Sequence, residues 1–305
     1  MMPKDIISIS DLRRKEILQL LDLSAELKVK RGKDPMQALL SNRSLAMIFE
    51  KPSTRTRVSF EVAMTELGGH ALYLNSDDLQ LGRSETICDT AMVLSRYVHA
   101  ITARVYSHET VLELAKCADI PVINALSDAE HPCQLLADLL TIRERKGDFQ
   151  GLRVAWIGDG NNVCNSLILA SAITDMHLSV ACPAGYEPDR TVLRHARELD
   201  GDVMVVNDPK EAASGADVLY TDVWVSMGDE KEEGERLRDF DGFQINENLL
   251  NHANPDCIVL HCLPAHRGQE ITGEVLDGAH SAVLDQAENR LHVQKALLVM
   301  LMAGQ

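Results

Sequence analysis

The chain has 305 residues, of which 45% are apolar and 25% charged, and its formal net charge at pH 7 is −16. This composition is typical of a soluble globular protein with room for two domains, and its acidic balance excludes the basic footprint of a nucleic-acid-binding protein. No apolar run reaches the roughly 18 residues of a membrane span, the start of the chain has no signal-peptide pattern, and the seven cysteines form no C-x-x-C pair. We therefore expect a cytoplasmic protein with free thiols and no membrane or nucleic-acid partner.

The first half of the chain alternates short apolar runs with helical patterns. An amphipathic helix is expected over residues 10–30. Strands are expected at residues 45–49, 71–74, 100–105 and 121–126, with helices at 58–67, 85–97 and 109–118. A longer helix is expected over 131–146, and Gly147, Asp148 and Gly151 then interrupt the pattern.

The second half repeats the alternation. Strands are expected at residues 153–157, 178–182, 203–207, 218–221, 257–261 and 282–284, with helices at 162–174 and 191–199 and a C-terminal helix at 287–303. Strands that alternate with helices predict an α/β fold of two domains, each a mostly parallel β-sheet flanked by helices. We place the domains at residues 1–147 and 148–305, and we expect the C-terminal helix to pack back on the first domain. Ligands of such sheets bind at the carboxyl ends of the strands.

A run of hydroxyl and guanidinium groups follows the first expected strand. Ser53 is a good N-cap for the next helix, and Ser53–Arg57 holds three hydroxyls and two arginines. A helix N-terminus offers unpaired N–H groups to an anion, and these side chains add donors suited to a phosphoryl group. The residues alone leave two readings open, a phosphate site or a capped helix with surface arginines.

A second set of polar groups lies further along the first domain. Arg104 ends an expected strand, and its guanidinium suits a phosphate. His131 and Gln134 lie three residues apart at the start of the long helix, so they share a face and can hydrogen-bond a carbonyl oxygen and an amide. A lone histidine is more often structural, so this reading also stays open.

Ser53–Arg57 followed by Ser59-Phe60-Glu61 resembles the carbamoyl-phosphate signature of the aspartate/ornithine carbamoyltransferase family, and His131–Gln134 resembles its H-P-x-Q motif. The resemblance implies that the carbamoyl-phosphate contacts are Ser53, Thr54, Arg55, Thr56, Gln80, Arg104, His131, Gln134, Cys262, Leu263 and Arg290. Gln80 lies in a segment, residues 78–85, that resembles the family loop reaching into the neighbouring subunit's active site. The resemblance therefore also implies a homo-oligomer, a homotrimer with active sites at subunit interfaces.

The segment Asp159–Asn162 follows a strand and carries part of a dinucleotide-binding pattern. Gly158 and Gly160 match the first two glycines of that fingerprint, but Val163 stands at the third position. A nucleotide-dependent oxidoreductase on the same fold is the rival that this pattern leaves open. In the resemblance, Asn162 instead binds ornithine.

The string D-V-W-V-S-M-G, residues 222–228, follows the strand at 218–221 and is similar to the string that distinguishes the ornithine-using branch of the family. By this resemblance Asp222, Ser226 and the Met227 backbone bind ornithine. A carboxylate at Asp222 suits the α-ammonium, and we expect Trp224 to pack in the core. The acidic stretch 228–242 is expected to be a loop, either a lid over ornithine or a solvated surface loop.

Cysteine and histidine side chains gather around the strand at 257–261. Cys257, His261, Cys262 and His266 suggest zinc or a nucleophilic thiol, but adjacent strand residues face opposite sides and the spacing of a structural site is missing. We expect no metal. The string H-C-L-P at 261–264 matches the ornithine branch, where the cysteine lies beside the substrate amine and the Leu263 carbonyl orients that amine.

The resemblance implies transfer of the carbamoyl group of carbamoyl phosphate to the side-chain amine of L-ornithine, giving L-citrulline and phosphate in arginine metabolism. Its catalytic residues would be Arg55, His131, Gln134, Asp222 and Cys262, with no cofactor. Rival acceptors are putrescine and N-acetylornithine, and a non-catalytic binding protein on the same fold also stays open. The sequence leaves the biosynthetic or catabolic direction undecided.

Overall fold

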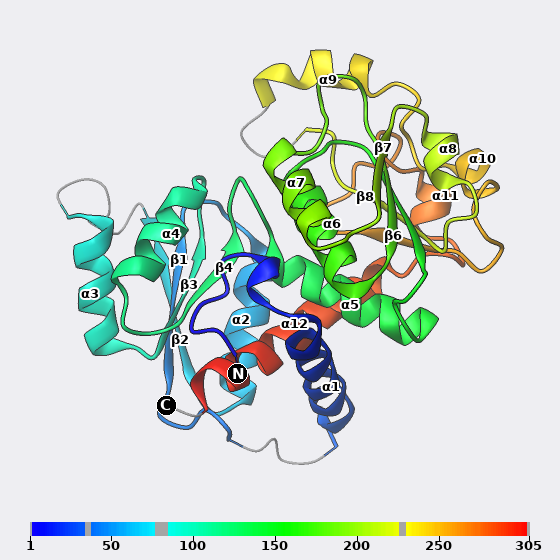
Figure 1. Cartoon of the computed structure of the whole chain (residues 1–305). Coiled ribbons are helices and arrows are strands. Elements are labelled where there is room, and N and C mark those ends of the chain that lie inside the picture. Colours follow the sequence, from blue (N-terminus) through cyan, green and yellow to red (C-terminus); the bar gives the residue numbers. More distant parts are fainter. Residues whose placement is uncertain (1, 34–37, 77–84, 226–229, 304–305) are drawn as a thin grey trace. The chain divides into compact units, whose positions relative to one another are not determined.

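The computed structural model describes residues 2–33, 38–76, 85–225 and 230–303 (Figure 1). The chain divides into two compact units. Unit 1 comprises Met1–Leu140 and Glu288–Gln305, and unit 2 comprises Thr141–Ala287. Among the described residues, no helix is both long enough and apolar enough to cross a membrane.

Unit 1 is built on a four-stranded parallel sheet with the order β2-β1-β3-β4. Its strands are β1 (Ser44–Phe49), β2 (His70–Asn75), β3 (Ala100–Arg104) and β4 (Val122–Leu126). Its helices are α1 (Arg14–Lys30), α2 (Thr54–Glu66), α3 (Ile87–Tyr97), α4 (His108–Cys117) and the first part of α5 (Pro132–Lys146), after a short 3-10 helix at Ile9–Asp11.

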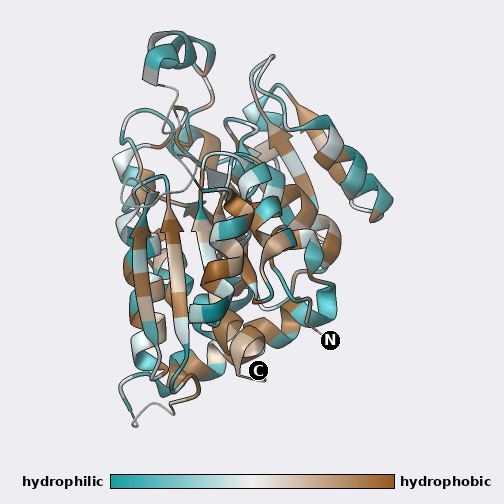
Figure 2. Cartoon of the chain, turned by 90° about the vertical axis from the view of Figure 1, so that its left-hand side faces the viewer, coloured by the Kyte–Doolittle hydropathy of each residue, from teal (hydrophilic) through white to brown (hydrophobic). Residues whose placement is uncertain are grey.

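The core of unit 1 forms because its central strands are apolar on both faces. Ala46, Ile48, Ile101, Ala103 and Val122 are fully buried and belong to one hydrophobic cluster. Strands covered on both faces read as continuous apolar runs, which is the pattern of these segments. In Figure 2 the strands are largely brown, that is hydrophobic, whereas the helices also carry teal, hydrophilic residues on one side.

The C-terminal helix α12 (Val283–Met302) packs on the first unit from Glu288 onward. Lys295 of α12 is fully buried and forms an ion pair with Glu66 of α2, and Lys28 of α1 donates to Asn289 Oδ1 at 2.8 Å. Buried charges are stable only when they are paired, so Glu66 holds this helix against α2. The predicted fold class, including the returning C-terminal helix, is confirmed.

Unit 2 is a five-stranded parallel sheet with the order β7-β6-β5-β8-β9. Its strands are β5 (Arg153–Ile157), β6 (His177–Ala181), β7 (Val203–Val206), β8 (Val218–Thr221) and β9 (Ile258–His261). Its helices are α6 (Asn162–Thr174), α7 (Arg190–Glu198), α8 (Pro209–Ala213), α9 (Glu233–Asp239), α10 (Glu247–Leu250) and α11 (Gly273–Leu276).

Three neighbouring strands of unit 2 end beside one another. In the order β5-β8-β9, the segments that follow are Gly158–Asn162, Asp222–Trp224 and Cys262–Pro264. Because the strands are parallel, their carboxyl ends meet at one edge of the sheet. The polar residues that the sequence places after each strand therefore come together here.

Two predicted elements are wrong in detail. Residues 282–284 are not a strand, because Val283 begins α12 and only Ser281 makes an isolated bridge, to Val259. An apolar run of three residues cannot distinguish a strand from a helix start. The described part of the predicted loop 228–242 contains a 3-10 helix at Glu230–Glu232 and then α9, whose acidic first turn and basic last turn match the helix dipole.

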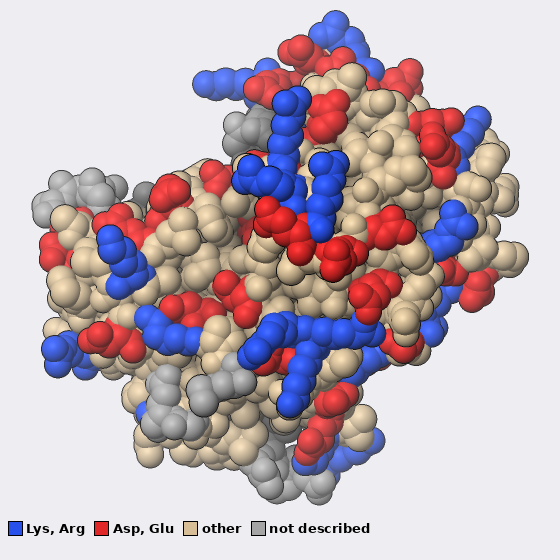
Figure 3. Space-filling view, in the orientation of Figure 1, with Lys and Arg blue, Asp and Glu red and all other residues tan. Residues whose placement is uncertain are grey.

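The expectation of free thiols is wrong for two of the seven cysteines. Cys88 of α3 and Cys117 of α4 form a disulfide, with a Cα–Cα distance of 5.1 Å. The two cysteines lie on neighbouring helices and are 29 residues apart in sequence, so no spacing rule could reveal the pair. On the face shown in Figure 3, Lys and Arg side chains are interspersed with Asp and Glu side chains.

We predict that the double variant C88S/C117S loses about 3 kcal/mol of unfolding free energy, because the disulfide restricts the unfolded chain over 29 residues. Urea denaturation with and without a dithiol measures this loss, and the reduced wild type should match the variant. Thiol titration of the denatured, unreduced protein should give five of the seven cysteines. Seven titratable thiols before reduction would contradict the prediction.

Candidate functional site

In unit 1, a cluster of polar side chains forms around the N-terminus of α2. Ser53 caps the helix, since its Oγ accepts from the Thr56 N–H at 3.2 Å. Its hydroxyl lies 3.0 Å from Thr56 Oγ1, and the Thr56 side chain is buried. Thr54 and Arg55 occupy the first turn and are exposed. The helix start thus offers free N–H groups, hydroxyls and one exposed guanidinium to an anion.

Arg290 of α12 connects this helix start to α5. Its guanidinium is buried, and it donates to Gln134 Oε1 at 2.6 Å and to Thr56 Oγ1 at 3.2 Å. Gln134 in turn donates from Nε2 to Asp138 Oδ1 at 2.8 Å, which fixes the orientation of the amide. The sequence predicted Gln134 and Arg290 but missed Asp138, which lies one helical turn beyond Gln134 and is recognisable by that spacing.

His131 and Arg104 complete this group, which we call the unit 1 cluster (Ser53, Thr56, Arg104, His131, Gln134 and Arg290). Both side chains are buried, Arg104 at the end of β3 and His131 just before α5. Burial lowers the pKa of His131 well below its usual value, and the charges of Arg290 and Arg104 lower it further. The imidazole is therefore neutral at pH 7, and the cluster presents cationic and neutral donors together.

In unit 2, the Asp222 carboxylate follows β8 and accepts three hydrogen bonds. The Cys262 thiol donates to Oδ1 at 2.8 Å, the Val223 N–H donates to the same oxygen at 2.8 Å, and Asn161 Nδ2 donates to Oδ2 at 2.9 Å. A carboxylate has about four acceptor positions, so one remains for a further donor. We call Asn161, Asp222 and Cys262 the unit 2 cluster.

The cap formed by Asn161 and the close packing at Gly160 determine the shape of the loop between β5 and α6. Asn161 caps α6 through Oδ1, which accepts from the N–H groups of Val163 and Cys164, so its Nδ2 faces Asp222. A Cβ on Gly160 would lie 2.3 Å from the Pro188 nitrogen. Gly160 is thus required by packing, which removes the main support for a dinucleotide site. The sequence missed Asn161, although its N-cap position is visible there.

Helix α9 is tied to this loop by a half-buried ion pair. Arg236 Nη1 donates to Asp159 Oδ2 at 2.7 Å and to the Trp224 carbonyl at 2.9 Å, and both charged side chains are only 12% exposed. Trp224 is buried and stacks on Phe240 with ring centroids 5.6 Å apart, which confirms its predicted core role. The segment after Asp222 is therefore anchored to the sheet.

Asn162 and Leu263 are two further predicted site residues, and both belong to unit 2. Asn162 begins α6 and is half-buried, and Leu263 follows Cys262 with a φ of +58°. Cys262 and Leu263 belong to unit 2, and the remaining described residues of the predicted carbamoyl-phosphate set belong to unit 1. Gln80, Ser226 and Met227 lie outside the described residues.

Asp222, His261 and Cys262 each place one potential metal-ligand atom within 4.8 Å of the others. His261, however, uses both ring nitrogens, Nδ1 for the Leu263 N–H and Nε2 for Glu270. A metal ion there would have to displace one of these bonds. The thiol of Cys257 is no alternative nucleophile, because burial raises its pKa to about 12.

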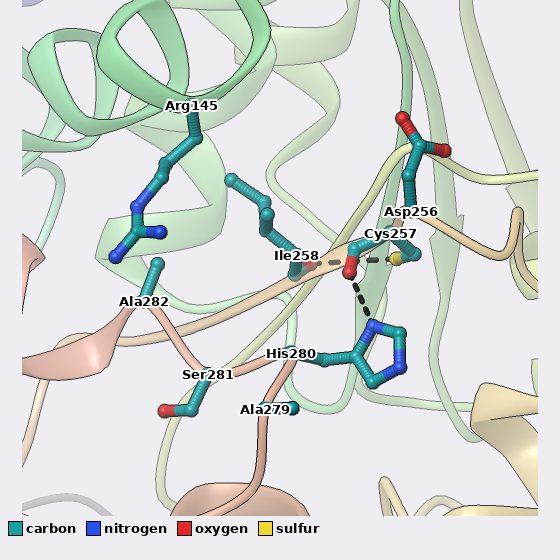
Figure 4. Close-up of a pocket in the computed structure, with 8 residues that line it drawn as sticks. All are labelled: Arg145, Asp256, Cys257, Ile258, Ala279, His280, Ser281 and Ala282. Atoms are coloured by element: carbon teal, nitrogen blue, oxygen red, sulfur yellow. Dashed lines mark hydrogen bonds between the residues drawn. The ribbon is translucent and has the colours of Figure 1, made fainter.

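A pocket of about 310 Å³ lies at the opposite end of β9 from Cys262 (Figure 4). Its lining residues are Arg145, Asp256, Cys257, Ile258, Ala279, His280, Ser281 and Ala282. His280 Nδ1 donates to the Cys257 carbonyl at 2.7 Å, and Arg145 forms an ion pair with Asp285. None of the predicted site residues lines this pocket, so it is separate from both clusters.

Residues 4–144 match the carbamoyl-P binding domain of aspartate/ornithine carbamoyltransferase, and residues 150–301 match the Asp/Orn binding domain of the same family. The chain belongs to the aspartate/ornithine carbamoyltransferase family. The unit 1 cluster apart from Arg290 lies in the first matched region, and Arg290 and the unit 2 cluster lie in the second.

Individual relatives are similar over nearly the full length. Ornithine carbamoyltransferase from Methanosarcina acetivorans is 60% identical over 301 residues, which cover 99% of this chain and 100% of that protein. The structure of ornithine carbamoyltransferase from Pyrococcus furiosus has a TM-score of 0.95 at 53% identity, covering 99% of this chain and 98% of that one. The structure of the Thermus thermophilus enzyme has a TM-score of 0.90 at 49% identity, covering 99% and 100%.

The lowered pKa of His131 predicts a pH effect on stability. Below about pH 6.5 the unfolded chain binds a proton that the folded chain does not, so stability is present above that pH and falls as the pH decreases. We expect the unfolding free energy of H131Q to fall less steeply than that of the wild type between pH 6.5 and 5. The two slopes should differ by up to about 1.4 kcal/mol per pH unit. Urea denaturation at several pH values measures this slope. The exposed His177→Gln is the control, and parallel slopes for H131Q and wild type would refute the prediction.

The crowding at Gly160 predicts a stability effect. G160A should lose at least about 2 kcal/mol of unfolding free energy, because the new methyl group meets the backbone of Glu187 and Pro188. The control is G234A in α9, where a Cβ meets nothing within 4 Å and helix propensity favours alanine. Thermal unfolding measures the melting temperatures of the two variants, and equal values would contradict the packing role of Gly160.

Proposed function

We propose that this chain transfers the carbamoyl group of carbamoyl phosphate to the side-chain amine of L-ornithine, giving L-citrulline and phosphate. The observation that carries the proposal is the bond between the Cys262 thiol and the Asp222 carboxylate, 2.8 Å long, at the carboxyl ends of β8 and β9. This pair supplies an anionic acceptor for an ammonium group and a nearby thiol. Membership in the family supports the same reaction.

The phosphate of carbamoyl phosphate binds at the start of α2 and at the end of β3. Ser53, Thr54, Arg55 and Thr56 offer hydroxyl, guanidinium and backbone N–H donors, and Arg104 adds a second guanidinium. Charge-assisted hydrogen bonds to phosphoryl oxygens are strong and directional. Arg290 and Gln80 belong to the same proposed set.

The carbamoyl group lies against Arg55, His131 and Gln134. Donors aimed at the carbonyl oxygen stabilise the negative charge that develops there on attack. A neutral His131 keeps one ring N–H for this purpose and adds no competing cation. Gln134 Oε1 already accepts from Arg290, and its second lone pair can accept from the carbamoyl amide.

Ornithine binds through Asn162, Asp222, Ser226 and the Met227 backbone, with its α-ammonium on Asp222. Its side-chain amine must be neutral to attack, although an aliphatic amine has a pKa near 10.4. The Asp222–Cys262 pair assists loss of that proton, and the Leu263 carbonyl orients the amine. The nitrogen then bonds to the carbonyl carbon, and the C–O bond to phosphate breaks. Phosphate leaves with the electron pair and takes the proton that the nitrogen releases.

The reaction needs no metal or organic cofactor, because the phosphate leaving group already activates the carbonyl. Holding the two substrates in attack geometry can supply several kcal/mol of the barrier reduction. We further propose a cytoplasmic homotrimer with active sites at subunit interfaces, working in arginine metabolism. Light scattering of the purified protein tests the trimer.

The proposal is tested by incubating purified protein with carbamoyl phosphate and, separately, ornithine, putrescine, N-acetylornithine and aspartate. Product analysis by mass spectrometry should find citrulline as the dominant carbamoylated amine. Asp222 is the residue that favours an acceptor with a free α-ammonium group. Product from aspartate or from putrescine alone would overturn the choice of acceptor while leaving carbamoyl transfer in place.

Replacement of Arg55 should separate catalysis from folding. Because Arg55 is exposed and lies on the first turn of α2, R55L should leave the melting temperature nearly unchanged. Turnover should fall by at least about a hundredfold, since the variant loses a charged phosphate and carbonyl contact. The exposed Arg194→Leu in α7 is the matched control. Near-normal kcat/KM in R55L would sink the phosphate assignment.

A further inference from the structure

His261, the last residue of β9, and Glu270 form a buried pair behind the H-C-L-P turn. Both side chains are fully buried, and His261 Nε2 lies 2.9 Å from Glu270 Oε1. The other ring nitrogen, Nδ1, accepts from the Leu263 N–H at 2.9 Å. Because Nδ1 takes a backbone N–H it carries no proton, so Nε2–H must donate to the carboxylate. The pair therefore defines one tautomer of the ring.

The turn that this ring contacts has an unusual backbone. Leu263 has a φ of +58°, in the left-handed region that L side chains other than Asn and Asp rarely adopt. Such a conformation persists only where surrounding contacts hold it. The bond from the Leu263 N–H to His261 Nδ1 is one such contact, made by a side chain two residues earlier.

Further bonds hold the same turn from outside. The His261 N–H donates to Gln286 Oε1 at 2.9 Å, and the His266 N–H donates to Glu270 Oε1 at 2.6 Å. One carboxylate oxygen thus joins the histidine ring to the far side of the loop. Cys262 lies between two residues anchored in this way, and its thiol donates to Asp222.

We propose that His261 and Glu270 are a positioning pair, which holds Cys262 and Leu263 in reacting geometry without contacting a substrate. The carboxylate keeps the ring proton on Nε2, so Nδ1 stays free to accept from Leu263. The proposal rests on the proposed function, in which Cys262 and the Leu263 carbonyl lie beside the amine of ornithine. In this proposal Nδ1 accepts from Leu263 and Nε2 donates to Glu270. Substitutions at His261 can remove one contact and keep the other.

The test compares H261N with H261Q. Asparagine places Oδ1 where His261 has Nδ1, so it keeps an acceptor for Leu263 and loses Glu270. Glutamine places its amide near the position of Nε2, so it keeps Glu270 and loses the acceptor. We expect kcat to fall at least about tenfold in H261Q and to stay within about threefold of wild type in H261N.

A readout independent of activity is amide hydrogen exchange in a peptide covering residues 258–266. The Leu263 N–H should be protected in wild type and H261N and should exchange faster in H261Q. The control is H177Q, which alters an exposed histidine that pairs with Asp202 at 2.6 Å. Exchange in this peptide and kcat should be unchanged there.

Equal kcat in H261N and H261Q, with equal exchange at Leu263, would overturn the positioning role and leave a merely structural pair. Absence of ornithine turnover in wild type would instead refute the proposed function, and the exchange comparison would still decide whether His261 holds the turn.

If H261Q does not fold, the variants E270Q and E270M are compared instead. Only the amide keeps an acceptor for Nε2–H, so kcat should be at least about fivefold lower in E270M, and equal values would overturn the proposal.

Discussion

The chemistry of unit 1 depends on the hydrogen bonds made by the Arg290 guanidinium. It is buried, permanently charged, and shared between Thr56 and Gln134, which lie 234 and 156 positions away in sequence. A buried guanidinium needs hydrogen-bond acceptors, so these contacts require the C-terminal helix to return to α2 and α5. The same charge lowers the pKa of His131 and helps to keep the imidazole neutral.

Unit 2 also contains a buried charged group that needs hydrogen-bond partners, but there the charge is negative. Its central group is the Asp222 carboxylate, whose burial is balanced by a thiol, an amide and a backbone N–H. These donors come from the ends of three adjacent strands, so the strand order β5-β8-β9 is what assembles them. Arg236 and the His261–Glu270 pair lie behind this group and hold its loops. Cationic donors in one unit and an anionic acceptor in the other suit an anionic and an ammonium substrate.

The fold was largely predictable because its strands are short apolar runs separated by strong helix patterns. Helix α6 and strands β5 and β8 were predicted with the bounds that the structure has. The failures share a physical cause. The acidic stretch before Phe240 looked like a loop, yet Phe240 is buried against Trp224 and Tyr186, and that tertiary contact stabilises α9. The Cys88–Cys117 disulfide likewise depends on which helices are neighbours.

By itself the sequence determined the alternation of strands and helices, the capped helix start at Ser53, and the placement of polar residues after strands. These features depend on local periodicity and on groups a few residues apart, which the sequence shows directly. The tertiary structure alone decided that Asn161 and Cys262 share one carboxylate, that Arg290 reaches Thr56, and that His261 uses both ring nitrogens. Hydrogen bonds form only at short distances and suitable angles, and chain position does not define those for distant residues.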